Sequence, residues 1–355
     1  MSARRRLDRF NRKIDNLWSG LFGPSSGNRI CNCIKIATEI QRDKNSQRVP
    51  NNRISYQHHL GIQCRASHEV RDRKLVDDDL TIRGLIFSAI VLAIVLLVGS
   101  RAALWYGRSI FAEPDVEVAQ SVTGALNAER IVLVFAHPDD EITATELISR
   151  AVEEGAFVAT VTATRGEAGT QYPEIVAQEH LGVVREGELR RHGFALGLDA
   201  QVVLGLPDGG VAEAVSEAQL TARVLEELVR LQPDAVVGFH PPSGVSLHPD
   251  HMAMGRAALA ATQAYARQRG EAVTLAYTLV SRPGTQRFGG ERYARVADLQ
   301  PDPDFALTVD ASLKTRAWRI HASQADYLRE TTGVPAWLLY RLWTQEYYAV
   351  RIIEP

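Results

Sequence analysis

Two residue types are almost missing from this 355-residue chain after Arg83: cysteine is absent there, and lysine occurs once, at Lys314. The three cysteines (Cys31, Cys33 and Cys64) and the other four lysines all come earlier. Any reaction performed by the later part therefore does not use a cysteine nucleophile. The spacing of the three cysteines is irregular and indicates reduced thiols rather than a metal site.

Charge is also divided unevenly along the chain. The net charge is −2, with 23% charged and 45% hydrophobic residues, which excludes a fully disordered chain, a collagen-like repeat and a multi-span membrane protein. Up to Arg83 there are 17 Lys and Arg against 9 Asp and Glu, and from Gly84 onward 23 against 33. The near-neutral total joins a basic leader to an acidic remainder.

The boundary between the two parts is an apolar run. Gly84–Gly99 carries no charge, and with Arg101 near its end the apolar stretch continues to Tyr106. A helix needs about 20 residues to cross the hydrocarbon layer. Arg101 can extend to the interface, where Trp105 also fits. We predict one transmembrane helix over residues 84–106.

Basic residues near this helix predict its orientation. Only Arg108 follows it closely, whereas five basic residues precede it within about 20 positions: Arg65, Arg71, Arg73, Lys74 and Arg83. The asymmetry places the N-terminus in the cytoplasm and the C-terminal domain outside it, on a single-pass membrane protein. A cleaved signal peptide is the alternative if the natural chain starts near residue 76, and the authenticity of residues 1–75 stays open.

Composition divides the remaining residues. Residues 1–83 are rich in Arg, Asn, Ser and Gln and are predicted to be a basic, disordered leader. The run Arg4–Arg6 is interpreted as a solvated tail, so no nucleic-acid partner is expected. Residues 107–127 are predicted to be a linker, and residues 128–355 the folded domain.

Short apolar runs alternate with helical spacing in that domain. Strands are expected at 130–136, 156–163, 201–204, 235–239, 273–280, 306–309 and 347–352. Helices are expected at 141–154, 175–197, 212–231, 249–268 and 311–330. This alternation predicts an α/β fold, a Rossmann-like, mostly parallel sheet with helices on both faces. Residues 281–301 are expected to be a loop that shapes substrate choice, and Trp337–Trp343 either core packing or a lipid-facing patch.

Histidines and carboxylates follow two of the strands. His137-Pro138-Asp139-Asp140-Glu141 comes after the first strand, and His248-Pro249-Asp250-His251 follows the fourth. Carboxyl ends of parallel strands share one edge of a sheet, so the clusters can converge. Three His or Asp ligands and an open water position make a catalytic zinc site, and a spare carboxylate can accept a proton from that water. For Glu141, helix-start electrostatics is an equally good interpretation.

These residues carry a resemblance to a known family. AHPDDE at 136–141 with HPDH at 248–251 resembles the zinc-dependent N-acetylglucosaminyl deacetylases of the PIG-L/LmbE-like family. Further matching positions run in the same order along the chain: Thr164–Gly169, Arg185 with Glu188, Leu206–Gly209, and Lys314 with His321–Gln324. The resemblance spans about residues 130–325.

The resemblance implies roles for single residues. It implies one zinc ion per chain, held by His137, Asp140 and His251. Asp139 would be the general base, and His248 would stabilise the oxyanion or protonate the leaving amine. The remaining implied roles are the orientation of a histidine, by Asp250, and the binding of sugar hydroxyls, by Arg185 and Asp208.

One position departs from the family. Some members have a tyrosine two residues before HPDH, where this chain has Ser246, so Tyr172 is a candidate substitute. Of the other histidines, His180 and His192 are expected to be surface or packing residues. His240 is left open between a supporting role at the site and a structural one.

The implied function is a membrane-anchored zinc hydrolase that removes acetyl from an N-acetylglucosamine-containing conjugate. Its partner would be a small-molecule or lipid-linked amino sugar. The alternatives are a metal-dependent amidase on another acyl-amide, lipid- or antibiotic-linked, and a non-catalytic sugar-binding module. The identity of the conjugate and the oligomeric state stay open.

Overall fold

A computed structural model describes residues 57–355, and their side chains from Thr81 onward. Residues 1–56 of the predicted leader lie outside the described part. The chain divides into two compact units, Met1–Phe87 and Ser88–Pro355. The described residues of the first unit all belong to helix α3 (Gln57–Phe111).

The prediction of disorder is therefore wrong for residues 57–83, which are helical. No proline occurs between Pro50 and Pro114. Extending an existing helix also requires no new nucleus, since each added residue contributes one more hydrogen bond. Composition alone did not predict that the neighbouring apolar helix would extend into residues 57–83.

Within α3, Thr81–Phe111 is long and apolar enough to cross a membrane, judged by length and composition. Its large apolar side chains, from Leu85 to Val98, are exposed rather than packed in a core. A soluble helix of this composition would be buried, so the exposure favours a membrane span over a core helix.

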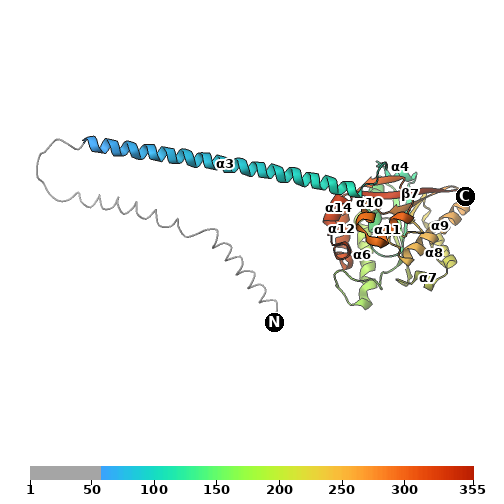
Figure 1. The fold of residues 1–355 in the computed structure, drawn as a ribbon. Helices are drawn as coiled ribbons and strands as arrows, with labels where there is room; N and C mark the ends of the chain where they lie inside the picture. Colours follow the sequence, from blue (N-terminus) through green and yellow to red (C-terminus); the bar gives the residue numbers. More distant parts are fainter. Residues whose placement is uncertain (1–56) are drawn as a thin grey trace. The chain divides into compact units, whose positions relative to one another are not determined.

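Seven strands form one sheet in the second unit (Figure 1). They are β1 (Arg130–Phe135), β2 (Phe157–Thr164), β3 (Ala200–Leu206), β4 (Ala235–Phe239), β5 (Val273–Leu279), β6 (Phe305–Thr308) and β7 (Gln345–Ile353). Their order is β3-β2-β1-β4-β5-β7-β6. The first five are parallel, and β7 pairs antiparallel with both β5 and β6. The predicted mostly parallel α/β fold is confirmed.

The crossover helices lie on both faces of this sheet. α5 (Thr145–Glu153) and α6 (Leu181–Leu196) connect strands that run outward from β1 to β3. α8 (Glu217–Leu231) and α9 (Pro249–Arg269) connect strands that run the other way, through β4 to β5. Because such crossovers are right-handed, the two pairs cover opposite faces. β1 between them is an apolar strand whose residues from Ile131 to Phe135 are buried.

Shorter helices complete the domain. They are α4 (Val122–Leu126), α7 (Val211–Ala214), α10 (Arg282–Phe288), α11 (Gly290–Leu299), α12 (Ala311–Ile320), α13 (Tyr327–Thr332) and α14 (Ala336–Leu342), with 3-10 turns at Asp140–Ala144, Gln178–His180 and Ala322–Gln324. The prediction that residues 281–301 form a loop is wrong, because α10 and α11 occupy them. Ser281 caps α10 by accepting the Gly284 N–H at 3.1 Å, and a proline stands in its first turn.

The segment predicted to be a linker is part of the folded unit. Its first residues end α3, and the Ala119 N–H then donates to Ala306 O at 2.9 Å beside the edge strand β6. In α4, Val122 and Leu126 are buried in the core. The apolar residues of this segment are spaced so that they reach the core, and this burial holds the segment against the domain.

Candidate metal and catalytic site

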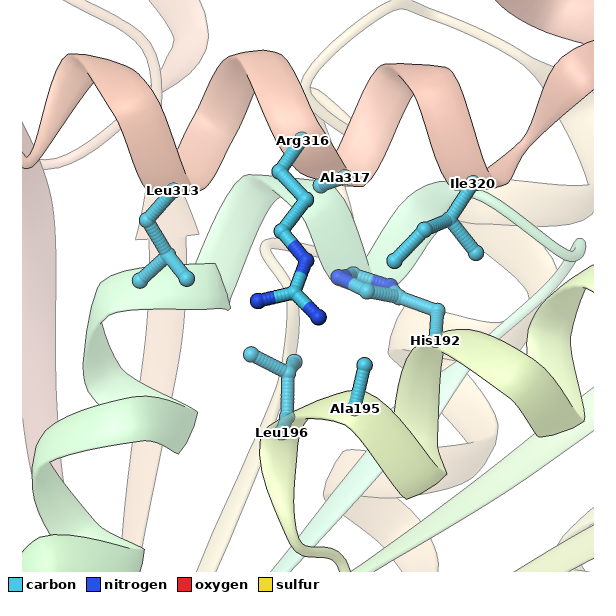
Figure 2. A pocket seen from close by; sticks show the side chains of 7 residues that line it. All are labelled: His192, Ala195, Leu196, Leu313, Arg316, Ala317 and Ile320. Atoms are coloured by element: carbon cyan, nitrogen blue, oxygen red, sulfur yellow. The ribbon is translucent and has the colours of Figure 1, made fainter.

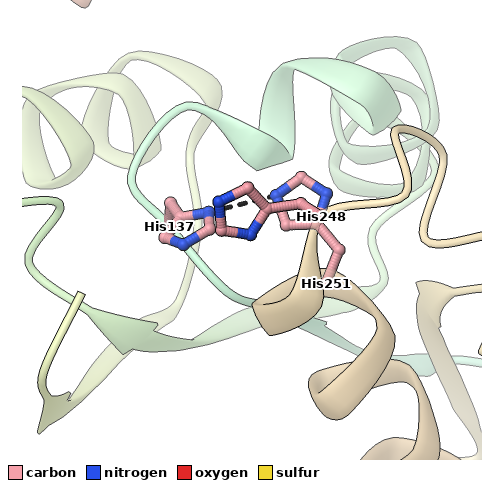
Figure 3. A group of neighbouring side chains, drawn as sticks. All are labelled: His137, His248 and His251. Atoms are coloured by element: carbon pink, nitrogen blue, oxygen red, sulfur yellow. Dashed lines mark hydrogen bonds between the residues drawn. The ribbon is translucent and has the colours of Figure 1, made fainter. Parts of the chain in front are cut away.

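The two histidine clusters meet where the strand order reverses. β1 and β4 are neighbours, and the chain leaves their carboxyl ends in opposite directions along the sheet. Such a switch point is where open α/β sheets bind ligands. His137 follows β1, while His248 and His251 begin α9 (Figure 3). The ring centroid of His137 lies 4.8 Å from that of His248 and 5.0 Å from that of His251.

The orientation of His251 is determined by its other ring nitrogen. Its Nδ1–H donates to Gly244 O at 2.9 Å, with Ser246 Oγ also 3.0 Å away. A carbonyl oxygen only accepts, so Nδ1 carries the proton and Nε2 presents a lone pair. The ring stacks on Phe239 at 4.4 Å. A histidine held in this way is oriented as a metal ligand.

The loop before α9 has a strained backbone. Val245 and Leu247 have φ angles of 51° and 57°, in the left-handed region that large side chains rarely adopt. Hydrogen bonds within the loop hold it, among them the Leu247 N–H to Ser243 O at 2.8 Å. This conformation places Gly244 O and Ser246 Oγ against His251. Such strain occurs mainly where it serves a site.

His137 is oriented by two carboxylates. Its Nε2 lies 3.2 Å from Asp250 Oδ2 and 3.0 Å from Asp208 Oδ1. Asp250 is fully buried, and its carboxylate accepts the backbone N–H groups of Gly209 at 2.8 Å and Val211 at 3.1 Å. When His137 donates through Nε2, its Nδ1 presents a lone pair, which faces His251 Nε2 at 3.0 Å.

Asp140 lies next to both histidines, and we refer to His137, Asp140 and His251 as the candidate triad. Its Oδ1 lies 3.2 Å from His251 Nε2, and its Oδ2 lies 3.6 Å from His137 Nδ1. Zinc–nitrogen bonds of about 2.0–2.1 Å in a tetrahedron place ligand atoms about 3.3 Å apart. The separations of 3.0, 3.2 and 3.6 Å are close to this value, the last two being measured to different oxygens of Asp140. Two other sets lie close enough to hold a metal ion: His137 with His248 and His251, and His137 with Asp208 and Asp250.

The electrostatics favour positive charge at this place. Burial alone would lower the pKa of His137, but hydrogen bonds to Asp208 and Asp250 and the charge of Asp140 raise it to about 10. For Asp140, burial would raise the pKa, but His251 and His137 outweigh it and lower the value. The carboxylates thus create a field that stabilises a cation at the triad.

Asp139 stands beside the triad with an unusual backbone. Its φ is 97°, and its N–H donates to Glu141 Oε2 at 3.0 Å. Its Oδ2 forms an ion pair with Arg185 Nη2 at 3.1 Å. Burial raises the pKa of Asp139 to about 6, although Arg185 opposes that shift. A carboxylate with such a pKa can accept a proton near neutral pH.

Arg185 and Asp208, for which the resemblance implies sugar binding, have protein partners. The buried Arg185 guanidinium donates to Gly166 O at 3.0 Å and Pro138 O at 2.6 Å, in addition to its pair with Asp139. Asp208 Oδ2 accepts the Ala168 N–H at 2.9 Å, while Oδ1 faces His137. Arg185 therefore holds Asp139 in place, and Asp208 holds His137.

His248 has a defined tautomer as well. Its Nδ1 accepts the backbone N–H of Asp250 at 3.2 Å, so Nε2 carries the proton. Burial, together with His137 and His251, lowers the pKa of His248. A neutral imidazole with an N–H directed to the site is a hydrogen-bond donor. His240 instead contacts Ser243 at 3.2 Å and the ring of Tyr277.

Sequence reasoning missed a buried network around Glu141. Glu141 Oε1 accepts from His192 Nδ1 at 2.8 Å and from His321 Nε2 at 2.7 Å. His192, expected to be a surface or packing residue, is thus buried and hydrogen-bonded, whereas His180 is exposed. The three side chains also lie close enough to be metal ligands. One feature of the sequence pointed to this network: Glu141 and His321 each belong to a motif that matches the family.

Other matched positions link the supporting helices. Glu188 of α6 accepts both the N–H and the hydroxyl of Ser323, at 2.8 and 2.6 Å. Lys314 of α12 is buried, donates to Ile142 O and pairs with Glu346. Tyr172, the candidate substitute for the missing tyrosine, stacks edge-on against Tyr327. These contacts hold α6, α12 and the turn after β1 together.

A small pocket lies between α6 and α12, next to this network. Figure 2 shows the Arg316 guanidinium beside the His192 ring within it. Its lining comprises His192, Ala195, Leu196, Leu313, Arg316, Ala317 and Ile320. Of the network around Glu141 only His192 reaches the pocket, and His137, Asp140 and His251 do not contribute to its lining.

Known proteins resemble this chain in the same region. Residues 132–262 match PIG-L, described as GlcNAc-PI de-N-acetylase. A 1D-myo-inositol 2-acetamido-2-deoxy-alpha-D-glucopyranoside deacetylase of Saccharomonospora viridis is 36% identical over 212 residues, covering 52% of this chain and 77% of its own. One of the same description from Kineococcus radiotolerans is 30% identical over 280 residues, covering 62% and 76%. A solved N,N'-diacetylchitobiose deacetylase from Pyrococcus horikoshii covers 65% of this chain and 86% of its own, at 19% identity and a TM-score of 0.47.

Proposed function

Because the chain belongs to the PIG-L family of de-N-acetylases, we propose that it removes the acetyl group from an N-acetylglucosamine-containing conjugate. The observation that carries this proposal is the position of His137 Nδ1 and His251 Nε2, 3.0 Å apart and beside Asp140. At this distance the two nitrogens share a proton in a hydrogen bond, and a metal ion can take the place of that proton when both present lone pairs.

We assign zinc as that cation, one per chain, held by His137, Asp140 and His251. Two imidazoles and a carboxylate are a ligand set that catalytic zinc uses, with a fourth position free for water. A bound zinc ion lowers the pKa of its water to about 7 and polarises the carbonyl oxygen of an amide. This chemistry supplies the nucleophile without a covalent intermediate.

The side chains around the triad perform the remaining tasks. Asp139 accepts the proton of the attacking water through its carboxylate, which Arg185 holds in place at 3.1 Å. His248 donates its Nε2–H to the developing oxyanion or to the leaving amine nitrogen. Asp250 and Asp208 keep His137 in the tautomer that a ligand requires. We assign Arg185 to the positioning of Asp139 and Asp208 to the positioning of His137. Any contact of these two side chains with the sugar is additional to this role.

The substrate class follows from the relatives. Those in Saccharomonospora viridis and Kineococcus radiotolerans are named as deacetylases of an acetamido-sugar linked to inositol. We propose a small-molecule or lipid-linked amino sugar for this chain. Residues 84–106 would anchor it in a membrane, with the N-terminus cytoplasmic and the catalytic domain outside. Protease digestion of intact cells tests this topology: loss of the domain supports it, and protection contradicts it.

The activity is tested with purified full-length protein. Metal analysis should find one zinc ion per chain, and a panel of N-acetylglucosamine conjugates should yield acetate and free amine. His137→Ala should lose the metal, whereas the isosteric Asp139→Asn should keep it and lose about 10²- to 10⁴-fold in kcat. Bound zinc without acetate release from any conjugate would favour a sugar-binding module. Full activity of Asp139→Asn would refute the assignment of the base.

A further inference from the structure

The apolar helix α3 is fastened to the catalytic domain at its C-terminal end. A Cβ at Gly107 would lie 2.7 Å from Leu342 Cδ2, so α3 and the end of α14 touch backbone to side chain. Arg108 Nε donates to Arg341 O at 3.0 Å. The buried Phe111 stacks on Trp343 at 5.8 Å. The last turn of α3 is thus packed directly against α14.

α10 meets the same end of the helix. The Phe111 ring stacks on Phe288 at 5.9 Å, and Phe111 O accepts from the Tyr347 hydroxyl at 2.9 Å. Glu113, two residues later, accepts the Arg282 N–H at 2.6 Å. The end of α3 is therefore in contact with α10, α14 and β7.

The distances of these contacts from the end of the apolar stretch, measured along the helix axis, follow from helix geometry. The apolar stretch ends at Tyr106, and a helix rises about 1.5 Å per residue, which puts Arg108 about 3 Å and Phe111 about 7.5 Å beyond it. The headgroup layer is about 5–7.5 Å thick on each side of the hydrocarbon core. If residues 84–106 span a membrane, the parts of α10 and α14 that contact α3 lie at the level of the headgroups.

The side chains exposed there have interfacial character. Trp105 on α3, Trp337 on α14 and Phe288 on α10 are 73%, 49% and 63% exposed. Cations accompany them: the Arg341 guanidinium lies 5.4 Å from the Trp337 ring centre, and that of Arg287 lies 6.0 Å from Phe288. Membrane proteins place tryptophan and arginine at the headgroup level, and phenylalanine occurs on helices that lie in this interface.

We propose that Phe288, Trp337, Arg287 and Arg341 form a membrane-seating surface that rests in the lipid headgroup layer beside the span. This inference depends on the proposed transmembrane helix. It goes beyond a tether, since it holds the domain in one orientation against the bilayer. The occupant of the surface is lipid, because the surface continues directly from the end of the apolar helix.

The seating surface also connects to the active site. α10 is followed by α11, whose Arg292 donates to Ser246 O at 2.7 Å. Ser246 Oγ in turn lies 3.0 Å from the ligand His251. The membrane-facing segment is thus two side-chain contacts away from the metal triad, so the seating fixes which edge of the sheet lies near the bilayer.

The cysteines of this chain allow a direct test. All three precede residue 84, so Cys31, Cys33 and Cys64→Ser give a background into which single cysteines are placed. Phe288→Cys and Trp337→Cys probe the surface, and Leu92→Cys probes the middle of the span. Phe194→Cys is the matched control, because Phe194 is 87% exposed on α6. Each cysteine carries an environment-sensitive fluorophore.

The labelled full-length variants are reconstituted into phosphatidylcholine vesicles with bromine on the acyl chains, near either the headgroup or the chain end. Bromine near the headgroup should quench labels at 288 and 337, bromine near the chain end should quench the label at 92, and neither should quench the label at 194. Retained metal content and deacetylase activity show that each variant is folded.

The experiment distinguishes failure of the seating surface from failure of the membrane span. Quenching at 92 without quenching at 288 and 337 would overturn the seating surface and leave the span intact. A blue-shifted but unquenched label at 337 would identify a protein partner, such as a second copy, and would also overturn the proposal. No quenching at 92 would refute the span, and the seating surface with it.

Discussion

The backbone N–H of Asp139 donates to the carboxylate of Glu141 at 3.0 Å, and it does so from a φ of 97°. A residue other than glycine with a positive φ of this kind costs about 1–3 kcal/mol. Glu141 is itself held by His192 and His321, at 2.8 and 2.7 Å. The proposed base is therefore kept in a strained conformation by a buried carboxylate that is itself bound to two histidines outside the proposed ligand set.

Glu141→Gln should lower kcat about tenfold or more and leave the metal content unchanged. An amide has one accepting oxygen, so it cannot accept from Asp139 on one side and from two histidines on the other, and a hydrogen bond to a charged group contributes about 1.5–3 kcal/mol. Steady-state kinetics and metal analysis measure this. The exposed Glu226→Gln is the control. Unchanged kcat in Glu141→Gln would show that the network only packs the interior.

The strain at Asp139 predicts an inverted order of stability. Asp139→Gly and Asp139→Ala both remove the carboxylate and should both be inactive. Glycine adopts a positive φ freely, whereas alanine does not, so the glycine variant should be more stable by about 1 kcal/mol. In an ordinary position alanine is the more stable of the two. Thermal unfolding of both variants decides the point, and a more stable alanine variant would contradict the strain.

Gly255 lets α9 approach the end of β4. A Cβ there would lie 2.6 Å from Phe239 O, so Gly255→Ala must displace the helix that carries His251. We expect a loss of about 1–3 kcal/mol in the free energy of unfolding and weaker metal binding. Gly187→Ala is the matched control, since no atom lies within 4 Å of its Cβ and alanine favours the helix. Equal stability of the two variants would contradict the close approach.

Glu154 should make the docking of α4 depend on pH. Its carboxylate accepts from the N–H groups of Val122 and Thr123 at 2.9 and 2.8 Å. Burial would raise the pKa of Glu154, but the hydrogen bonds from Thr123, Val122 and Ser121 outweigh it and lower the pKa below its ordinary value of 4.5.

A carboxylate whose pKa is lower in the folded state stabilises the fold above its unfolded pKa, and this contribution is lost as the pH falls through the folded pKa. Glu154→Gln should therefore cost about 1 kcal/mol at pH 7, a small effect because the group is exposed to solvent. The difference from the unmodified chain should shrink below about pH 4.5. Denaturant titrations at pH 7 and below about pH 4.5 measure this difference in the free energy of unfolding, with neighbouring Glu153→Gln as control. A constant difference would refute the linkage.

The strands and the place of the site were predictable for a physical reason. β1 and β4 are buried on both faces and are therefore continuously apolar, which is readable in one sequence. The parallel order then brings the residues after each strand to one edge. Helices such as α10 and α14 were not anticipated, because they are short and rely on contacts with Phe111 rather than on periodicity.

Partners far apart in the chain escaped prediction. Glu141 lies 51 residues from His192 and 180 from His321, and no local pattern joins them. The Arg185 guanidinium binds Asp139 and Pro138 O and is not left unpaired for a sugar. It also donates to Gly166 O, in the loop after β2. Such pairings depend on the packing of whole helices, which residue spacing does not encode.

The burial of Lys314 has a practical consequence for amine chemistry. No other lysine follows Arg83, and Lys314 is 3% exposed and paired with Glu346. Amine-directed biotinylation or cross-linking of the folded protein would modify only lysines before the apolar helix, and the chain's α-amine. With a reagent that does not pass through membranes, labelling would report the side on which the leader lies, free of signal from the catalytic domain.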